Sequence, residues 1–313
     1  MSDVVTLGET MALVRADNSG PLPHVHGLTL GIGGSESNFA IGLARLGASV
    51  TWIGAVGQDS LGDLVVRELR AEGVTVVARR DPAAPTGLMI KERRTPEQLK
   101  VWYYRTGSAG SYLAPDDIPA DVISGARLLH VTGITPGLSP CAAEATSYAV
   151  DVARQAGTLV SFDVNYRAGV WSADDARPVL QKLCGRADIV FAGEEEGALV
   201  VGNGDASTLA RRFAELGPTQ VVIKRGSQGA YALVDGMEYD QPVVPVTSID
   251  SVGAGDAFVA GYLAELLAGL PPAGRLLTAA RLGAFACLVL GDWEGAPRRS
   301  ELALLDGGEP VTR

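Results

Sequence analysis

The stretch Leu159-Val160-Ser161-Phe162-Asp163-Val164-Asn165-Tyr166-Arg167 contains the pattern on which the predicted fold depends. Its first four residues are mainly apolar, as in a buried strand, and alternating polar residues follow directly. Comparable apolar runs occur at residues 4–7, 50–56, 128–131, 189–191 and 221–223. Helical patterns fall between them, at residues 39–46, 61–69, 141–155 and 208–216. Because near-continuous apolar strands alternate with helices, we expect an α/β fold with a mostly parallel sheet covered on both faces.

Two stretches, residues 11–32 and 86–105, depart from this alternation. The first contains His24-Val25-His26 and Leu28-Thr29-Leu30, and the second alternates from residue 88 to 94 and again from 101 to 105. Such alternation is typical of antiparallel strands with one wet face, so we expect these two excursions to build a small β-sheet, here called the lid.

Residues 1–10, 33–85 and 106–313 would then form the α/β domain. A small sheet of this kind leaves an exposed edge or face that a second subunit often covers, so we expect a homo-oligomer formed through the lid.

The segment Asp250-Ser251-Val252-Gly253-Ala254-Gly255-Asp256-Ala257-Phe258 places three small residues before an apolar helix. Small residues at a helix start leave backbone N–H donors exposed, and together with the helix dipole these donors form an anion site. Asp256 lies in the first turn of that helix, where its carboxylate could take a proton from an attacking hydroxyl. An acid there is also an ordinary helix-start residue.

Three further loops offer polar or glycine-rich contacts. Paired glycines at Gly33-Gly34 let a backbone approach a small ligand, and Asn38 opens a helix; the alternative is a plain loop with a helix cap. Asp163, Asn165 and Arg167 alternate at the carboxyl end of an apolar strand, the edge at which ligands bind in open α/β sheets.

The third loop, Lys224-Arg225-Gly226-Ser227-Gln228-Gly229, also ends an apolar strand and gives a glycine turn suited to a nucleotide. In the lid, Tyr103 and Arg105 share one face, and an arginine fork suits a carboxylate ligand. Trp102 and Tyr104 lie on the opposite face and are expected to be half-buried strand residues.

The composition excludes several classes of protein. The 313 residues include 26 Lys and Arg against 36 Asp and Glu, a net charge of −10, which argues against nucleic acid or an anionic membrane as a partner. No apolar run approaches the ~20 residues that a membrane span needs, and no signal peptide is visible. Cys141, Cys184 and Cys287 form no CxxC pair, so we expect a cytoplasmic protein.

Neither a Walker-type P-loop nor a GxGxxG fingerprint after the first strand is present. Taken together, the segments instead resemble the PfkB (ribokinase-like) carbohydrate kinase family. Gly33-Gly34 with Asn38 is similar to its N-terminal signature, and residues 250–256 are similar to its C-terminal one. Residues 103–111, 163–167 and 291–295 are most similar to its 2-keto-3-deoxygluconate kinases.

The resemblance implies a three-layer α/β/α sandwich with a β-sheet lid, and phosphoryl transfer from MgATP to a sugar hydroxyl. Asp256 would be the general base, and the N–H groups of Gly253, Ala254 and Gly255 would stabilise the transferring group. The nucleotide site would be formed by Lys224, Gly226, Gly229, Asp163 and Asn165. The substrate would contact Gly33, Gly34, Asn38, Tyr103, Arg105 and Arg167, with the two arginines suited to the carboxylate of a keto acid.

One position departs from the family pattern. The family often has Asn-x-x-Glu near the Mg²⁺ and phosphate groups, and this chain has Gly193 where Asn is expected but keeps Glu196, which would act on Mg²⁺ through water. Two alternatives stay open within the fold: another sugar kinase, acting for example on fructose or ribose, and a non-catalytic sugar or nucleotide sensor. A nicotinamide dehydrogenase would also suit the fold alone, but its fingerprint is missing.

Overall fold

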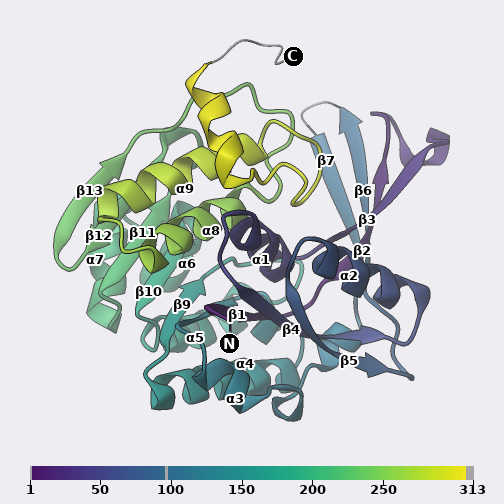
Figure 1. The fold of residues 1–313 in the computed structure, drawn as a ribbon, viewed down its shortest axis with the longest axis horizontal. Helices are drawn as coiled ribbons and strands as arrows, with labels where there is room; N and C mark the ends of the chain where they lie inside the picture. The colour runs from purple at the N-terminus through teal and green to yellow at the C-terminus, as the bar shows by residue number, and fades with distance from the viewer. Residues whose placement is uncertain (1, 96–97, 308–313) are drawn as a thin grey trace.

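The computed structural model describes residues 2–95 and 98–307. Within these ranges, the larger sheet has nine strands in the order β13-β12-β11-β10-β9-β8-β1-β4-β5 (Figure 1). Its strands are β1 (Val4–Leu7), β4 (Val50–Gly57), β5 (Thr75–Asp81), β8 (Leu128–Thr132), β9 (Leu159–Asp163), β10 (Ile189–Gly193), β11 (Gln220–Lys224), β12 (Ala230–Val234) and β13 (Met237–Gln241). Neighbouring strands are parallel except at β11–β12 and β12–β13, which confirms the mostly parallel sheet.

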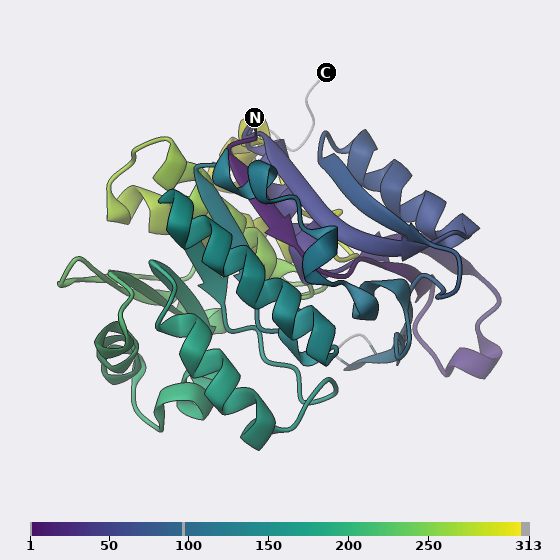
Figure 2. The same ribbon diagram turned by 90° about the horizontal axis from the view of Figure 1, so that it is seen from below.

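Helices cover both faces of this sheet, and Figure 2 shows it between the two helical layers. One core cluster joins the sheet to α1 (Ser35–Arg45), α2 (Ser60–Ala71), α8 (Ala254–Leu267) and α9 (Pro272–Ala286). The other joins it to α3 (Ala120–Ser124), α4 (Pro140–Ala156), α5 (Ala173–Cys184), α6 (Glu194–Val201) and α7 (Ala206–Leu216). The predicted α/β/α sandwich is therefore confirmed. None of the described helices is long and apolar enough to cross a membrane.

Short 3₁₀ turns complete the described elements: η1 (Leu22–His24), η2 (Ala109–Tyr112), η3 (Pro115–Asp117), η4 (Thr135–Gly137), η5 (Gly226–Gln228) and η6 (Arg299–Asp306).

The second sheet has the order β3-β2-β6-β7 and stands beside the α/β layers (Figure 1). Its strands are β2 (Met11–Ala16), β3 (Leu28–Gly33), β6 (Leu88–Thr95) and β7 (Gln98–Tyr104). Each excursion forms an antiparallel pair, but β2 and β6, which join the two, run parallel. The strand predicted at His24-Val25-His26 is wrong, because Pro21 and Pro23 lack N–H donors and residues 22–24 form a 3₁₀ turn.

The lid has one covered and one open face. Met11, Leu13 and Met89 form a small buried cluster on the covered face. On the other face Trp102 and Tyr104 are 42% and 61% exposed, so the half-buried state predicted for them is wrong in the single chain. Leu28 and Leu30 on β3 are exposed as well.

Candidate active site

The start of α8 offers free backbone donors. Gly253 caps the helix at a positive φ of 76°, and a Cβ there would overlap the carbonyl oxygen of Asp292, so only glycine fits. The N–H of Ala254 donates to the carbonyl of Ser251 at 3.3 Å. Among the described residues the N–H groups of Gly253, Gly255 and Asp256 have no hydrogen-bond acceptor, so these donors are available to an anion.

Asp256 is held by two side chains from α1. Ser35 Oγ donates to its Oδ1 at 2.7 Å, and Asn38 Nδ2 donates to its Oδ2 at 2.8 Å. Ser35 in turn accepts from Asn165 Nδ2 at 2.6 Å, which places Asn165 behind the carboxylate. Burial raises the pKa of Asp256 above its usual value, opposed by these hydrogen bonds and by Arg167. The result is an oriented carboxylate with increased proton affinity.

Lys224 and Asp163 form an ion pair at the carboxyl ends of β11 and β9. Lys224 Nζ lies 2.9 Å and 2.7 Å from the two carboxylate oxygens. Burial raises the pKa of Asp163 to about 6, an effect that Lys224 opposes and Glu196 and Asp256 increase. A Cβ on Gly255 would lie only 3.7 Å from Lys224 Nζ, so the ammonium group lies next to a free N–H donor.

Glu196 lies in the first turn of α6, just after the carboxyl end of β10. Its Oε2 accepts the N–H of Gly193 at 2.6 Å, and its Oε1 lies 3.7 Å from Nη1 of Arg167, whose side chain is 48% exposed. A Cβ at Gly193 would make only an ordinary contact of 3.4 Å with Glu196, so the missing Asn is not a matter of space.

The two glycines predicted after β11 differ in their surroundings. A Cβ at Gly226 would meet nothing within 4 Å, so this turn is open to a ligand. At Gly229 a Cβ would overlap the carbonyl of Gln241, which means that chain packing alone already requires glycine. Both have positive φ, 54° and 88°.

Gly33 and Gly34 lie where the lid meets α1. A Cβ at Gly33 would overlap Met89 of β6 and press on the carboxylate of Asp292, and one at Gly34 would come within 2.5 Å of the Glu9 carbonyl. Asp292 also forms a buried ion pair with Lys91 on the covered face of the lid. Burial raises the pKa of Asp292 to about 6, against the opposing effect of Lys91.

Arg105 is held by an acid that the sequence did not suggest. Its Nε and Nη2 lie 2.8 Å and 2.6 Å from Oε2 of the buried Glu9, and Ser108 donates to the other oxygen. The fork predicted for a carboxylate ligand therefore binds Glu9. The guanidinium also lies 5.8 Å from the centre of the Tyr103 ring.

The sequence analysis missed Ser35, Glu9, Lys91 and Asp292. All four act through partners more than 90 residues away, so no local spacing could reveal them. A weak signal did exist for Lys91, because a lysine on the apolar side of an alternating strand needs a buried partner.

Free N–H donors, a lysine and a carboxylate with raised pKa meet at one edge of an α/β sheet, beside a lid. Phosphoryl transfer needs such an arrangement, because positioning and charge stabilisation supply most of its catalysis. Residues 1–299 match the model of the pfkB family of carbohydrate kinases, and the chain belongs to this family.

Two relatives and one solved structure show which members of the family the chain is similar to. The chain is 38% identical to a 2-dehydro-3-deoxygluconokinase of Bacillus subtilis, over 96% of this chain and 94% of that protein. It is 35% identical to a 2-dehydro-3-deoxygalactonokinase of Haloferax volcanii, over 93% and 92%. The crystal structure of a putative ribokinase II from E. coli in complex with ATP and Mg²⁺ superimposes with a TM-score of 0.91 at 25% identity, covering 98% of this chain and 99% of that one.

Proposed function

We propose that this chain transfers the γ-phosphoryl group of ATP to the 6-hydroxyl of 2-keto-3-deoxygluconate. The observation that supports this most directly is the buried Asp256 carboxylate, which Ser35 and Asn38 hold in a fixed orientation. Arg167 acts electrostatically on Asp256, and Arg105 lies beside Tyr103 at the lid. A keto acid offers a hydroxyl for the carboxylate and a carboxylate for the arginines.

Each residue then has a role. Asp256 accepts the proton as the sugar oxygen bonds to the γ-phosphorus and the bond to the bridging oxygen breaks. The N–H groups of Gly255 and Asp256 hold the equatorial oxygens, and Gly253 supplies the turn that aims them. Ser35 and Asn38 orient the carboxylate.

The residues at and just after the carboxyl ends of β9, β10 and β11 have the chemistry that suits ATP and Mg²⁺. Bound Mg²⁺ would neutralise phosphate charge, and it prefers oxygen ligands while keeping several waters. Asp163 and Glu196 offer such oxygens, and Glu196 would act on Mg²⁺ through water. Lys224 would hold the phosphates, and the open turn at Gly226 would admit the nucleotide.

One observation favours the alternative of a neutral-sugar kinase. Glu9 occupies the fork of Arg105, which reduces the charge available to a substrate carboxylate. A relative named fructokinase, from Klebsiella pneumoniae, is also 34% identical over 86% of the chain.

A coupled kinase assay decides between these substrates. Wild type would be assayed with the gluconate- and galactonate-derived keto acids, fructose and ribose, next to Arg105→Ala and Arg167→Ala. We expect each variant to raise KM for the keto acid at least about tenfold, as for the loss of a charged hydrogen bond, and to change KM for a neutral ketose much less. Equal effects on both substrates would contradict the keto-acid assignment.

The open face of the lid supports a homo-oligomer formed through it. Leu28, Leu30, Trp102 and Tyr104 are exposed there, and two copies could cover each other's apolar residues. Leu30→Glu should lower the mass measured by light scattering to that of one chain, whereas Tyr148→Glu on α4 should not. An unchanged mass for Leu30→Glu would argue against this interface.

Closure of the lid over the substrate is a further part of the proposal, because excluding water prevents ATP hydrolysis. Protease cleavage within residues 86–105 should slow when the sugar is bound. Equal cleavage with and without sugar would contradict ligand-dependent closure.

A further inference from the structure

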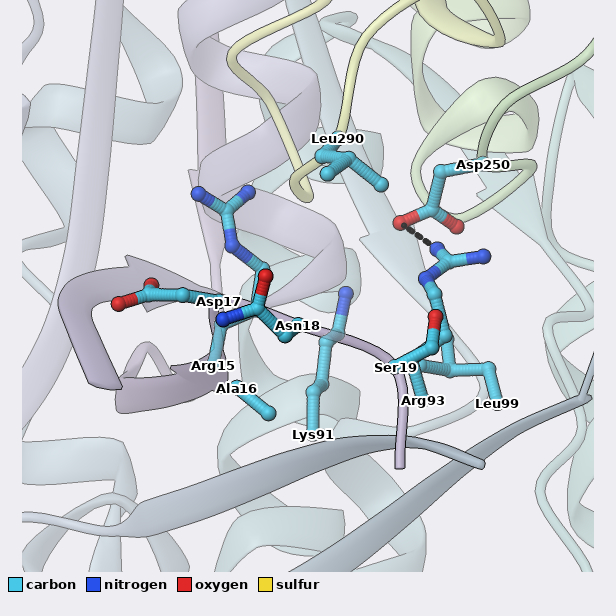
Figure 3. A pocket seen from close by; sticks show the side chains of 10 residues that line it. All are labelled: Arg15, Ala16, Asp17, Asn18, Ser19, Lys91, Arg93, Leu99, Asp250 and Leu290. Carbon is cyan, nitrogen blue, oxygen red and sulfur yellow. Dashed lines mark ion pairs between the residues drawn. The ribbon is translucent and has the colours of Figure 1, made fainter. Parts of the chain in front are cut away.

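A small cavity lies between the lid and the segments that precede α8 and follow α9 (Figure 3). Its volume is about 80 Å³. The side chains of Arg15, Lys91 and Arg93 point into it from the lid, opposite Asp250 and Leu290. Cations therefore dominate the lid side of this cavity.

The three cations share a face because of the strand register. Arg15 on β2 is paired with Lys91 on β6, and Arg93 follows Lys91 by two residues. Like charges on neighbouring strand positions repel, so such a cluster requires compensating anions.

Two of the three cations form an ion pair with an acid from the α/β domain. Lys91 binds Asp292, and Arg93 Nη2 lies 3.0 Å from Oδ2 of Asp250. Arg15 has no hydrogen-bond or ion-pair partner among the described residues, although its Nη1 is buried. Asp17, the acid that also lines the cavity, instead accepts the hydroxyl of Thr29 at 2.5 Å.

A buried guanidinium N–H without an acceptor is costly, and native proteins satisfy nearly all such groups with protein, water or an ion. The cavity is several times larger than the ~10–15 Å³ that a single water needs, yet too small for a nucleotide. Asn18 and Ser19 at its rim are exposed, so the cavity lies close to solvent.

We infer that this cavity binds a small oxyanion of the phosphate class, with Arg15 as its main ligand. The anion would supply the acceptor that the buried Nη1 of Arg15 lacks among the described residues. The inference does not depend on the sugar that the kinase uses.

Thermal unfolding measured against inorganic phosphate tests this site. Ionic strength is kept constant with chloride, and an excess of Mg²⁺ and a non-hydrolysable ATP analogue fills the nucleotide site. For wild type we expect a saturable rise in Tm, and calorimetry should show one site per chain.

Arg15→Leu should abolish the saturable rise and weaken phosphate binding at least about tenfold, as for a lost charged hydrogen bond. Without phosphate it should unfold at the same or a higher temperature than wild type, because an unpaired cation beside Lys91 is removed. Arg15→Lys should retain weaker binding. Arg94→Leu removes the same charge from an exposed position on β6 and should respond like wild type.

The inference is overturned if wild type shows no saturable response, or if Arg15→Leu responds as wild type does. It is also overturned if the response disappears once the nucleotide analogue is present, because the phosphate would then occupy the nucleotide site. Glycerol 3-phosphate in place of phosphate distinguishes the source: tighter binding indicates the phosphate group of a metabolite, and weaker binding indicates free phosphate.

Discussion

The nine-stranded sheet and the lid place their charged residues in different ways. In the large sheet, Lys224 and Asp163 pair with each other at the strands' carboxyl ends, and the strand interiors are mainly apolar, with a few buried polar residues such as His130 and Ser161. In the lid, Lys91, Arg93 and Arg105 each pair with an acid outside it: Asp292, Asp250 and Glu9. The large sheet is thus held by its own apolar layers, whereas the position of the lid depends on charge pairs with the rest of the chain.

The largest expected effect is the loss of kcat on changing Asp256, which lies in the α/β domain. Asp256→Asn keeps the shape of the side chain but removes the base, so kcat should fall about 10²–10⁴-fold with little change in KM for ATP. In wild type, kcat/KM should fall as the pH drops through the pKa of Asp256, and this loss should occur at a higher pH than for an ordinary aspartate, because burial raises that pKa. If Asp256→Asn kept nearly full kcat, Asp256 would not be the general base.

On the lid side, the strongest test is Lys91→Met. It leaves Asp292 buried without its cation, and breaking a buried pair in this way costs about 3–5 kcal/mol of unfolding free energy. Without Lys91 the pKa of Asp292 rises further, so the loss should be largest above pH 6 and smaller in acid, where the carboxyl is protonated.

Denaturant unfolding at pH 5.5 and pH 8 measures this difference. Lys91→Met with Asp292→Asn should recover part of the stability at pH 8. An equal loss at both pH values would mean that Lys91 contributes through packing rather than charge.

Glu9→Gln tests whether the lid charges also serve binding. Glutamine has one acceptor oxygen for Arg105 and no charge, so the arginine should lose its fixed orientation. We expect this loss of orientation to outweigh the removal of a negative charge beside Arg105, so that KM for the acidic sugar rises about 10–100-fold, the range for charged hydrogen bonds, with KM for ATP unchanged. Glu72→Gln breaks the Arg45–Glu72 pair outside the site and should affect stability alone. A parallel rise in KM for ATP would indicate general disruption.

Two glycines of the anion site allow a matched comparison. Gly253→Ala would place an alanine in a left-handed backbone conformation, which costs about 1–2 kcal/mol of unfolding free energy. Its Cβ would also overlap the carbonyl oxygen of Asp292. Gly255→Ala adds a methyl group at an ordinary distance from Lys224 and needs no unusual backbone. Unfolding free energies should therefore fall for Gly253→Ala and change little for Gly255→Ala. Equal losses would show that the turn does not require the conformation of Gly253.

The smallest expected effect is that of Gly193→Asn. The position has extended backbone at φ −75° and space for a side chain, and Asn caps a helix better than Gly by a few tenths of a kcal/mol. The unfolding midpoint should rise slightly, and kcat should rise if the amide positions phosphate as in the family pattern. A drop in stability would show that Gly193 is needed by the fold.

The sequence predicted the large sheet far better than the lid contacts. Strands such as β4 and β9 are mainly apolar runs, so local residues are enough to predict them. The β12–β13 hairpin was missed although Asp235-Gly236, with φ of 50° and 81°, is a typical tight hairpin turn. Asp256 and Asn38 were found from helix-start patterns, whereas Glu9 and Asp292 depend on partners distant in sequence.

That distance has a consequence for how the protein is made. The Ser35–Asp256 contact spans 221 residues and the Lys91–Asp292 pair spans 201. Contacts of such long range require large loops to close, so they are slow to form. During synthesis, the lid strands and α1 leave the ribosome long before α8 and Asp292. The nascent chain can build much of its central sheet early, but Asp256 meets Ser35, and Asp292 meets Lys91, only after these late residues have been made.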